Sequence, residues 1–456
     1  MPAQANSDAS IWIKSPLAVL ADAAGGGLVV SAGRIVELVP SGGVPSRPCT
    51  EFDASRHVVI PGLVNTHHHM FQTLTRAHPS AINKSLWPWI SALYPIWARN
   101  MSPDAFRIAS RLAMAELMMS GCTCAADHHY LFTPGLDDAM DVQAEEAAAL
   151  GLRMTLTRGA LDLAGGEGGQ ALAPPHTVQD TDTILADCER VIGRYHDTAD
   201  GAMTQVALAP CAPFDVSLEL MRQTASLSRR HRCGLHTHLV ETGAEADFVR
   251  SRHGCDAVDY LEQCDWLNER VWLAHGIHFS DTELARLGKH GVGICHCPTS
   301  NMLLASGMCR TTELEQTGCA LGLGVDGSAS NDNSNMMEAL RHALLLGRLK
   351  YGAEAITHLD VLRWGTAGSA RCLGRSDIGE IAVGKQADLA FFTLDDLRFS
   401  GAGDPIAALI LCGAHHADRV MVQGRWTVTD GVPVGLDLER LRHDHGQAAR
   451  VFAHSL

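Results

Sequence analysis

The stretch VVIPGLVNTHHH, residues 58–69, joins a long apolar run to three consecutive histidines. An almost unbroken apolar run predicts a strand that is buried on both faces, as in a parallel sheet covered by helices. The run ends at Asn65 and Thr66, and His67–His69 follow directly. In α/β folds, polar residues at the carboxyl end of a parallel strand lie where active sites are built. We therefore interpret this stretch as the first strand of a parallel sheet that leads into a functional site.

Seven further apolar runs follow. They are CTCAAD (122–127), RMTLTRG (153–159), VALAP (206–210), GLHTHLV (234–240), VWLAHGI (271–277), GVGICHC (291–297) and ALGLGVD (320–326). Helix-forming sequence follows each run, for example at 104–120, 138–150 and 217–230. Eight βα units in roughly 300 residues predict an α/β protein with a (β/α)8 TIM-like barrel. An open, doubly wound sheet is the alternative.

Both ends of the chain have a different pattern, with short alternating strands separated by Gly and Pro. These segments occur within residues 11–60 and again at 379–394 and 419–431. We predict a small β-sandwich domain made from both termini, with the barrel inserted into it. The expected limits are 1–60 for its first half, 61–369 for the catalytic barrel, and 370–456 for its second half plus a terminal helix. A Gly- and Pro-rich segment, 163–175, is expected to be either a plain surface loop or a cover over the active site.

The composition restricts the cellular setting. Among 456 residues, 46% are hydrophobic and 19% are charged, which is typical of a globular protein and excludes a disordered chain. The net charge of −15 disfavours a nucleic-acid partner. The 14 cysteines are scattered, and no secretory signal or membrane span is evident in the sequence. We expect a cytoplasmic protein with neither a nucleic-acid nor a membrane partner.

Four side chains at the strand ends form a candidate metal site. His67 and His69 alternate along the first strand and therefore point to the same side. His238 ends the fifth strand and Asp326 ends the eighth, so the barrel brings all four to one face. Three imidazoles and one carboxylate suit Zn²⁺, with Fe²⁺ as the alternative, better than Mg²⁺ or Ca²⁺. No lysine lies between residues 84 and 289 to bridge a second metal, so we expect one divalent ion.

Three side chains beside this site are candidate catalytic residues. A metal ion in such a site lowers the pKa of bound water and makes a hydroxide nucleophile. Glu241, three residues beyond His238, is placed to exchange protons with a substrate. His275 ends the sixth strand, and together with Asp326 it can orient the water and take its proton. A metal-dependent binding protein without turnover would have no need of such a proton shuttle, although it stays as the alternative from another class.

The motifs around these residues resemble the amidohydrolase superfamily, in its branch of aromatic-ring deaminases and s-triazine hydrolases. The matching segments are PGLVNTHHH, THLVET, LAHGIH, HCPTSNMLLASG, LGVDGSASN and GEIAVGKQADLAFF. The resemblance implies a distorted barrel, one zinc or iron ion, and hydrolytic removal of an exocyclic substituent from a heteroaromatic ring. It places the family's metal ligands on His67, His69, His238 and Asp326, its proton-shuttling Glu on Glu241, and its sixth-strand His on His275.

A finer resemblance, in NTHHHMFQTLTRA, SLWPWISALYPIWA, AADHHYLF and LAPCAPF, implies a particular substrate. It implies deamination of an oxidised purine base, 8-oxoguanine, to urate and ammonia. Metal-bound hydroxide would attack C2, and Glu241 would protonate the adjacent ring nitrogen. Deamination or dechlorination of another ring (guanine, isoxanthopterin, cytosine or an s-triazine) is the alternative. The family is often dimeric or larger, so the resemblance also implies a homo-oligomer.

Five residues are expected to contact the substrate. Gln72 lies where guanine deaminases place a purine-reading Gln. Trp89 could stack on a flat ring or pack beneath the long first loop, and His128 could hydrogen-bond a ring oxygen. Cys211 and Asn301 lie in the matched segments LAPCAPF and HCPTSNMLLASG. Guanine deaminases typically carry an Arg near Cys211, and its absence here disfavours guanine as the preferred substrate.

Overall fold

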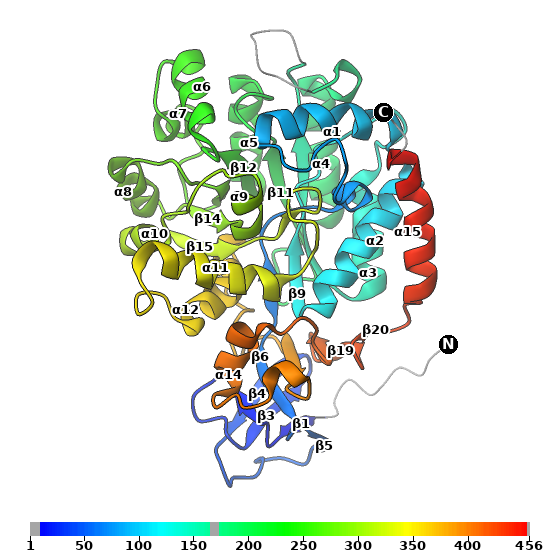
Figure 1. Cartoon of the computed structure of the whole chain (residues 1–456), viewed down its shortest axis with the longest axis vertical. Helices are drawn as coiled ribbons and strands as arrows, with labels where there is room; N and C mark the ends of the chain where they lie inside the picture. Colours follow the sequence, from blue (N-terminus) through cyan, green and yellow to red (C-terminus); the bar gives the residue numbers. More distant parts are fainter. Residues whose placement is uncertain (1–9, 165–172, 454–456) are drawn as a thin grey trace.

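The computed structural model describes residues 10–164 and 173–453. Eight parallel strands form one sheet in the order β15-β14-β13-β12-β11-β10-β9-β7. The backbone N–H of Thr66, just after β7, donates to Leu323 in β15 at 3.0 Å, so the two ends of the sheet meet. This nearly closed, helix-covered barrel confirms the predicted (β/α)8 architecture (Figure 1). The central part of the predicted 163–175 loop, residues 165–172, lies outside the described residues.

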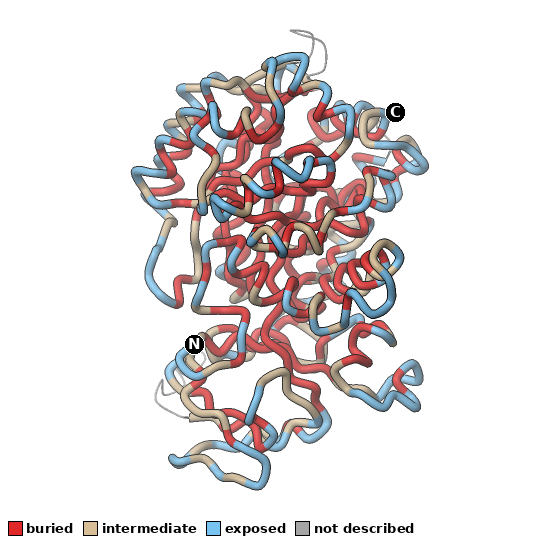
Figure 2. Tube along the Cα trace, turned by 90° about the vertical axis from the view of Figure 1, so that its left-hand side faces the viewer, coloured by how far each residue is buried: buried red, intermediate tan, exposed pale blue. Residues whose placement is uncertain are grey.

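The barrel strands coincide closely with the predicted apolar runs. They are β7 (Leu63–Asn65), β9 (Cys122–Ala126), β10 (Arg153–Ala160), β11 (Thr204–Pro210), β12 (Gly234–Leu239), β13 (Val271–His275), β14 (Gly293–His296) and β15 (Ala320–Leu323). A short parallel pair, β8 (His68–His69) and β16 (Asp326–Gly327), extends the two closing ends. Most residues of these strands are buried, because helices cover the barrel outside and side chains fill it inside (Figure 2).

The helices around the barrel have recognisable ends. They are α1 (Leu86–Asn100), α2 (Pro103–Met119), α3 (Ala139–Leu150), α4 (Thr181–Tyr195), α5 (Leu218–His231), α6 (Gly243–His253), α7 (Ala257–Gln263), α8 (Asp281–Lys289), α9 (Pro298–Leu303), α10 (Thr311–Thr317), α11 (Met336–Tyr351), α12 (His358–Arg363) and α13 (Ser369–Cys372). In α5 the Ser217 side chain accepts a bond from Leu220 N, and Arg229, Arg230 and His231 occupy the last turn. Such capping and charge placement stabilise both ends of a helix.

The first predicted strand, 58–66, is two strands in the structure. Its first half is β6 (His57–Pro61), which belongs to the terminal sheet, and its second half is barrel strand β7. The chain passes between the two sheets at Gly62, where an added Cβ would lie 2.2 Å from Thr123 Oγ1. An apolar run gives no sign of such a division, since both halves are buried.

Segments from both ends of the chain form two smaller sheets, as predicted. One has the order β4-β3-β1-β5, and the other β2-β6-β17-β18-β19-β20. Their strands are β1 (Ile11–Lys14), β2 (Ala18–Val19), β3 (Gly27–Ser31), β4 (Arg34–Val39), β5 (Thr50–Asp53), β6, β17 (Leu389–Thr393), β18 (Arg419–Val422), β19 (Arg425–Thr429) and β20 (Val432–Pro433). β6 pairs antiparallel with β17, so the N- and C-terminal segments share one sheet.

One helix lies where the sequence did not place it. The long first loop contains α1, so Trp89 is on a helix. The terminal helix α15 (Leu438–Ala453) packs beside α2 of the barrel (Figure 1). Short helix α14 (Pro405–Ala408) lies with the terminal sheets. The domain limits at residues 60 and 369 stay predictions. No helix within the described residues is both long and apolar enough to cross a membrane.

Candidate active site

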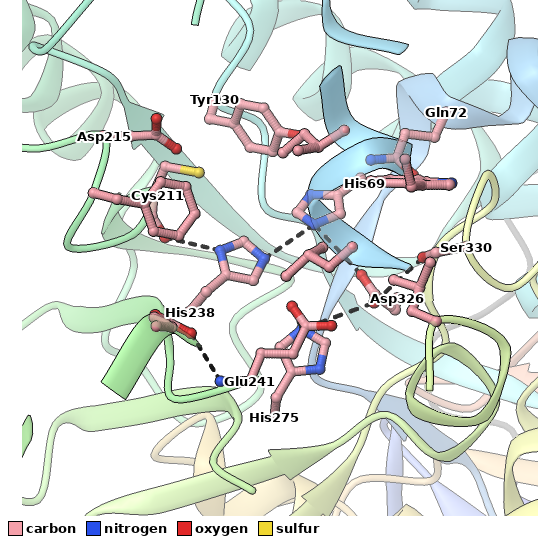
Figure 3. Close-up of a pocket in the computed structure, with 16 residues that line it drawn as sticks. His69, Gln72, Tyr130, Cys211, Asp215, His238, Glu241, His275, Asp326 and Ser330 are labelled. Carbon is pink, nitrogen blue, oxygen red and sulfur yellow. Dashed lines mark hydrogen bonds and ion pairs between the residues drawn. The ribbon is translucent and has the colours of Figure 1, made fainter. Parts of the chain in front are cut away.

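The carboxyl ends of the barrel strands surround a cavity with about 520 Å³ of empty space including its mouth (Figure 3). Its polar lining consists of His69, Gln72, Tyr130, Cys211, Asp215, His238, Glu241, Glu245, His275, Asp326 and Ser330. Its apolar lining consists of Leu86, Trp89, Ile90, Phe214 and Leu304. Every candidate catalytic residue therefore borders one cavity, and so do three of the four candidate metal ligands.

His67, the fourth candidate ligand, lies directly behind this lining and is held by a second histidine. Nδ1 of His236 is 2.8 Å from the carbonyl of Trp272, which can only accept, so His236 donates from Nδ1 and its Nε2 must accept. Nδ1 of His67 lies 2.8 Å from that Nε2 and is therefore the donor. Nε2 of His67 is then an unprotonated lone pair, and it is buried with no hydrogen-bond partner. A buried, unpartnered imidazole nitrogen fits a metal ligand.

His69 and His238 are fixed in the same tautomer by backbone carbonyls. His69 Nδ1 donates to the carbonyl of His128 and His238 Nδ1 to that of Cys211, each at 2.8 Å. Their Nε2 atoms face each other at 3.2 Å. Burial lowers the pKa of both rings, so both are neutral at pH 7 and two lone pairs point at each other. A cation bound by both Nε2 atoms would remove the repulsion between their lone pairs.

Asp326 completes the set of donors. Its Oδ1 lies 3.2 Å from Nε2 of His67 and 3.4 Å from Nε2 of His69. Ligands about 2.0–2.1 Å from a tetrahedral zinc are separated by about 3.3 Å, so these spacings fit one zinc-sized ion. The residues present therefore fit a single divalent metal.

The backbone is strained at two strand ends that carry candidate site residues. Asp326 has φ of 66° and His275 has φ of 68°, in the left-handed region that non-glycine residues rarely adopt. Such strain persists only where the surrounding structure fixes it, and it gathers at functional sites. The N–H of Asp326 donates to the carbonyl of His67 at 3.1 Å, which ties the strained turn to the first strand.

Glu241 and His275 lie next to the candidate metal donors. His275 Nε2 is 3.5 Å from Glu241 Oε2 and 3.9 Å from Asp326 Oδ2, while its Nδ1 bonds Asn301 Oδ1 at 2.9 Å. Burial raises the pKa of Glu241. Burial opposes the charged form of His275, but the negative charges of Glu241 and Asp326 raise its pKa overall. Ser306 Oγ donates to Glu241 Oε1 at 2.7 Å and fixes the carboxylate.

The five predicted substrate contacts divide into two groups. Gln72, Trp89 and Cys211 line the cavity. His128 and Asn301 are outside its lining and contact residues that border it. His128 Nε2 donates to the carbonyl of Ala209 at 2.9 Å, and its ring stacks on His238. Each of these two residues supports a residue of the cavity wall from behind, and their contact with a substrate stays a prediction.

Several site residues were not singled out from the sequence. His236 precedes His238 by two positions on one strand face, and this alternation is a signal that could have revealed it. Tyr130, Asp215, Glu245 and Ser306 carry no comparable signal, because loops and helix starts bring them to the cavity. His68 points away and bonds Ser334 Oγ at 3.0 Å, as the alternation predicts.

Comparison with known proteins relates this geometry to a family. The family model described as "Amidohydrolase family" matches residues 58–427. The chain is 58% identical over 443 residues to 8-oxoguanine deaminase of Pseudomonas aeruginosa, covering 96% of this chain and 98% of that one. It is 35% identical to an isoxanthopterin deaminase from an unknown prokaryotic organism, over 88% of this chain and 86% of that one.

A solved structure has the same fold as this chain and supports the same family. The atrazine chlorohydrolase of Arthrobacter aurescens TC1, complexed with zinc, superposes with a TM-score of 0.89 at 28% identity, covering 96% of this chain and 100% of that one. The match therefore includes the terminal sheets as well as the barrel. With a family match along most of the chain and a close relative along nearly all of it, this protein belongs to the amidohydrolase family.

Proposed function

We propose that this protein is an aminohydrolase that converts 8-oxoguanine and water to urate and ammonia. The observation that carries the proposal is the 58% identity to 8-oxoguanine deaminase across nearly the full length of both chains. In this reaction the C2–NH2 bond breaks, a bond from C2 to the oxygen of water forms, and the amino group leaves as ammonia. The cavity is lined by both apolar and polar side chains, with the candidate catalytic residues together at the reacting end, which suits a flat, neutral base.

His67, His69, His238 and Asp326 would hold one divalent metal, and the nitrogen-rich donor set favours Zn²⁺ over Fe²⁺. When bound, the ion supplies a water of lowered pKa as the nucleophile. Metal analysis of the purified protein tests this assignment: we expect about one equivalent of zinc per chain. A similar content of iron, with activity restored by Fe²⁺ alone, would overturn the choice of zinc.

Three residues of the chain handle the protons. Glu241, buried at the cavity wall and fixed by Ser306, donates a proton to the ring nitrogen next to C2, so that C2 becomes tetrahedral. Asp326 and His275 orient the attacking water and accept its proton. Return of that proton to the exocyclic nitrogen makes ammonia the leaving group.

Substitution of Glu241 tests this scheme. Glu241→Gln keeps the shape of the side chain but removes the exchangeable proton, so we expect turnover to fall at least about a hundredfold with the metal content unchanged. Ammonia release and metal analysis measure the two effects. Glu269→Gln, at a mostly exposed site, is the control. Undiminished ammonia release from Glu241→Gln would sink the mechanism.

The choice of ring has a specific competitor, because the chain also resembles isoxanthopterin deaminase at 35% identity. We would compare kcat/KM for 8-oxoguanine, isoxanthopterin and guanine by ammonia release. We expect 8-oxoguanine to be preferred, and no Lys or Arg among the described cavity-lining residues is available to read a guanine carbonyl. Equal or better activity on either competitor would defeat the assignment.

Assembly and location in the cell stay predictions. We expect a homo-oligomer in the cytoplasm, with no nucleic-acid or membrane partner. Light scattering on the purified protein distinguishes a monomer from an oligomer.

A further inference from the structure

The three imidazoles of the candidate metal site differ in what orients them. The Nδ1–H groups of His69 and His238 each donate to a backbone carbonyl at 2.8 Å. His67 Nδ1 instead meets a side chain, Nε2 of His236, at 2.8 Å. A backbone carbonyl is present whatever side chain the residue carries, whereas a side-chain acceptor depends on the residue type. The orientation of His67 therefore depends on which amino acid occupies position 236.

His236 belongs to a closed cycle of hydrogen bonds with Trp272, Thr66 and His67. The Nδ1–H of His236 donates to the Trp272 carbonyl at 2.8 Å, and the Trp272 Nε1–H donates to the Thr66 carbonyl at 3.0 Å. Thr66 is joined to His67 by a peptide bond, and the Nδ1–H of His67 donates back to His236. The cycle thus connects the end of β7 with two neighbouring strands, β12 and β13.

Burial and stacking hold this cycle rigid. All four of its residues are at most 1% exposed. The imidazole of His236 lies against the indole of Trp272, with centroids 4.5 Å apart and planes inclined by 11°. Because solvent does not reach the cycle, water cannot replace a lost partner, and a buried N–H without an acceptor is costly. The cycle therefore fixes the plane of the His236 imidazole.

The same bonds exclude the other tautomer of His67. With its proton on Nε2, His67 would direct an Nδ1 lone pair at the Nε2 lone pair of His236. His236 cannot respond by moving its own proton to Nε2, because its Nδ1 would then direct a lone pair at the Trp272 carbonyl, which only accepts. The favoured tautomer leaves a lone pair on His67 Nε2, 3.2 Å from Oδ1 of Asp326.

We propose that His236 is a positioning residue of the metal site, which holds His67 in the tautomer and orientation that present Nε2 to a divalent ion. Trp272 in turn holds His236. The inference rests on the metal assignment made with the proposed function. It assigns part of the metal affinity to a side chain that is neither one of the four candidate ligands nor part of the cavity lining.

Two substitutions of His236 test this role. His236→Leu removes the acceptor while keeping a side chain of similar size, so His67 is left with a buried N–H that has lost its acceptor. We expect the zinc affinity, measured by competition with a chromophoric chelator, to fall about ten- to a hundredfold. His236→Gln keeps an oxygen that can accept this N–H and should recover most of the affinity. A Leu variant within about threefold of wild type, or a Gln variant as weak as the Leu variant, would overturn the proposal.

His129→Leu is the matched control. His129 is another fully buried histidine of the barrel, and neither of its ring nitrogens has a hydrogen-bond partner. The substitution therefore removes a buried imidazole without breaking a bond to a candidate ligand, and we expect the zinc affinity to be retained. An equal loss in His129→Leu would show that general loosening of the barrel, rather than the bond to His67, lowers the affinity.

The hydrogen bond can also be observed in the unaltered protein. An N–H···N bond transmits a spin–spin coupling between its two nitrogens. In the zinc-loaded protein labelled with ¹⁵N-histidine, we expect such a coupling between two imidazole nitrogens, and we expect it to disappear in His236→Gln, where the acceptor is oxygen. Absence of the coupling from well-resolved imidazole N–H signals of the wild type would overturn the proposal, even if His236→Leu does not fold.

Further measurements separate this inference from the proposed function. The melting temperature of each variant in chelator shows whether it is folded before zinc is added. If the wild-type protein binds no zinc, the metal assignment fails and this inference fails with it. If the wild type binds zinc and releases ammonia from 8-oxoguanine, but the His236 variants bind zinc equally well, this inference alone fails.

Discussion

At the scale of single residues, Glu241, the proposed proton shuttle, is held by a hydroxyl from another loop. Ser306 Oγ donates to Glu241 Oε1 at 2.7 Å, and the Ser306 carbonyl accepts from His278 Nε2 at 2.9 Å. Glu241 follows Val240, whose φ of 47° places it in the left-handed region. The carboxylate proposed to shuttle protons is thus held by groups on two separate loops, and in this scheme Ser306 is a positioning residue.

Removing the Ser306 hydroxyl should impair turnover more than binding. For Ser306→Ala we expect kcat to fall about tenfold or more with KM nearly unchanged, because a hydrogen bond to a charged group is lost. Ser306→Thr retains the hydroxyl and should recover most of kcat. Steady-state kinetics on the pair measure this, and a Thr variant as slow as the Ala variant would show that the hydroxyl is not the cause.

Glu245 gives the folded protein a specific pH dependence. Burial raises the pKa of its carboxyl to about 7 from an ordinary value of 4.5, and its Oε2 accepts the Glu241 N–H at 2.8 Å. Between these two pH values the folded state holds a proton that the unfolded chain releases. The contribution of Glu245 to the free energy of unfolding therefore falls as pH rises through this window.

Glu245→Gln removes that titration while keeping an oxygen acceptor. Relative to wild type, we expect its melting temperature to rise progressively from about pH 5 to about pH 7 and then to level off. Differential scanning fluorimetry of both proteins gives the difference directly, so other titrating groups cancel. A difference independent of pH contradicts the assignment. Glu269→Gln, mostly exposed, should show no trend.

The grouping of the four candidate metal donors was predictable because they lie at fixed positions on strands. Their positions at strand ends, and the two-residue alternation along a strand, suffice to predict that four side chains lie together: His67, His69, His238 and Asp326. The paths of the loops need not be known for this prediction. Asp215 and Ser306 were not predictable in this way. Each reaches the cavity from a loop whose path is set by tertiary hydrogen bonds rather than by periodicity.

At the scale of elements, the passage from the terminal sheet to the barrel depends on Gly62. It lies between β6 and β7, and an added Cβ would lie 2.2 Å from Thr123 Oγ1 and 2.3 Å from Thr123 Cγ2. Both sheets are buried here, so neither can move away freely. The apolar run 58–66 predicted one buried strand and gave no sign that it is shared between two sheets.

Gly62→Ala should therefore destabilise the protein. We expect about 1–3 kcal/mol of lost stability from overpacking. Gly193→Ala, on the exposed face of α4 where nothing lies within 4 Å, should instead gain about 0.5–1 kcal/mol. Chemical denaturation of the two variants measures the contrast. Equal stabilities for Gly62→Ala and wild type would show that the junction has room for a Cβ.

At the scale of the whole molecule, the candidate metal ligands join distant parts of the chain. β8 and β16 pair directly, and their residues include His69 and Asp326. His238 comes from β12 across the barrel. A bound ion therefore links the first, fifth and last βα units, so its binding free energy adds to the stability of the closed barrel.

Removing the metal should lower the melting temperature. At free zinc a thousandfold above Kd, binding contributes about 4 kcal/mol to stability, which chelation removes and zinc restores. In His67→Ala we expect the zinc-dependent shift to be lost or much reduced, whereas His443→Ala, at an exposed position of α15, should retain it. A His67→Ala protein with the full shift would show that zinc stabilises the fold from another site.

The two ends of the barrel that meet in the fold are far apart in the sequence, so they are synthesised at different times. The Thr66 hydroxyl bonds the Leu323 carbonyl across 257 residues of chain, so the first histidines leave the ribosome long before their carboxylate partner. At a synthesis rate of about 5–20 residues per second, Asp326 is added roughly 13–50 s after His67 and His69. During that time they form only part of a coordination sphere. Metal loading is thus a late event in the life of the nascent chain, and fragments that end before the last βα unit lack a complete site.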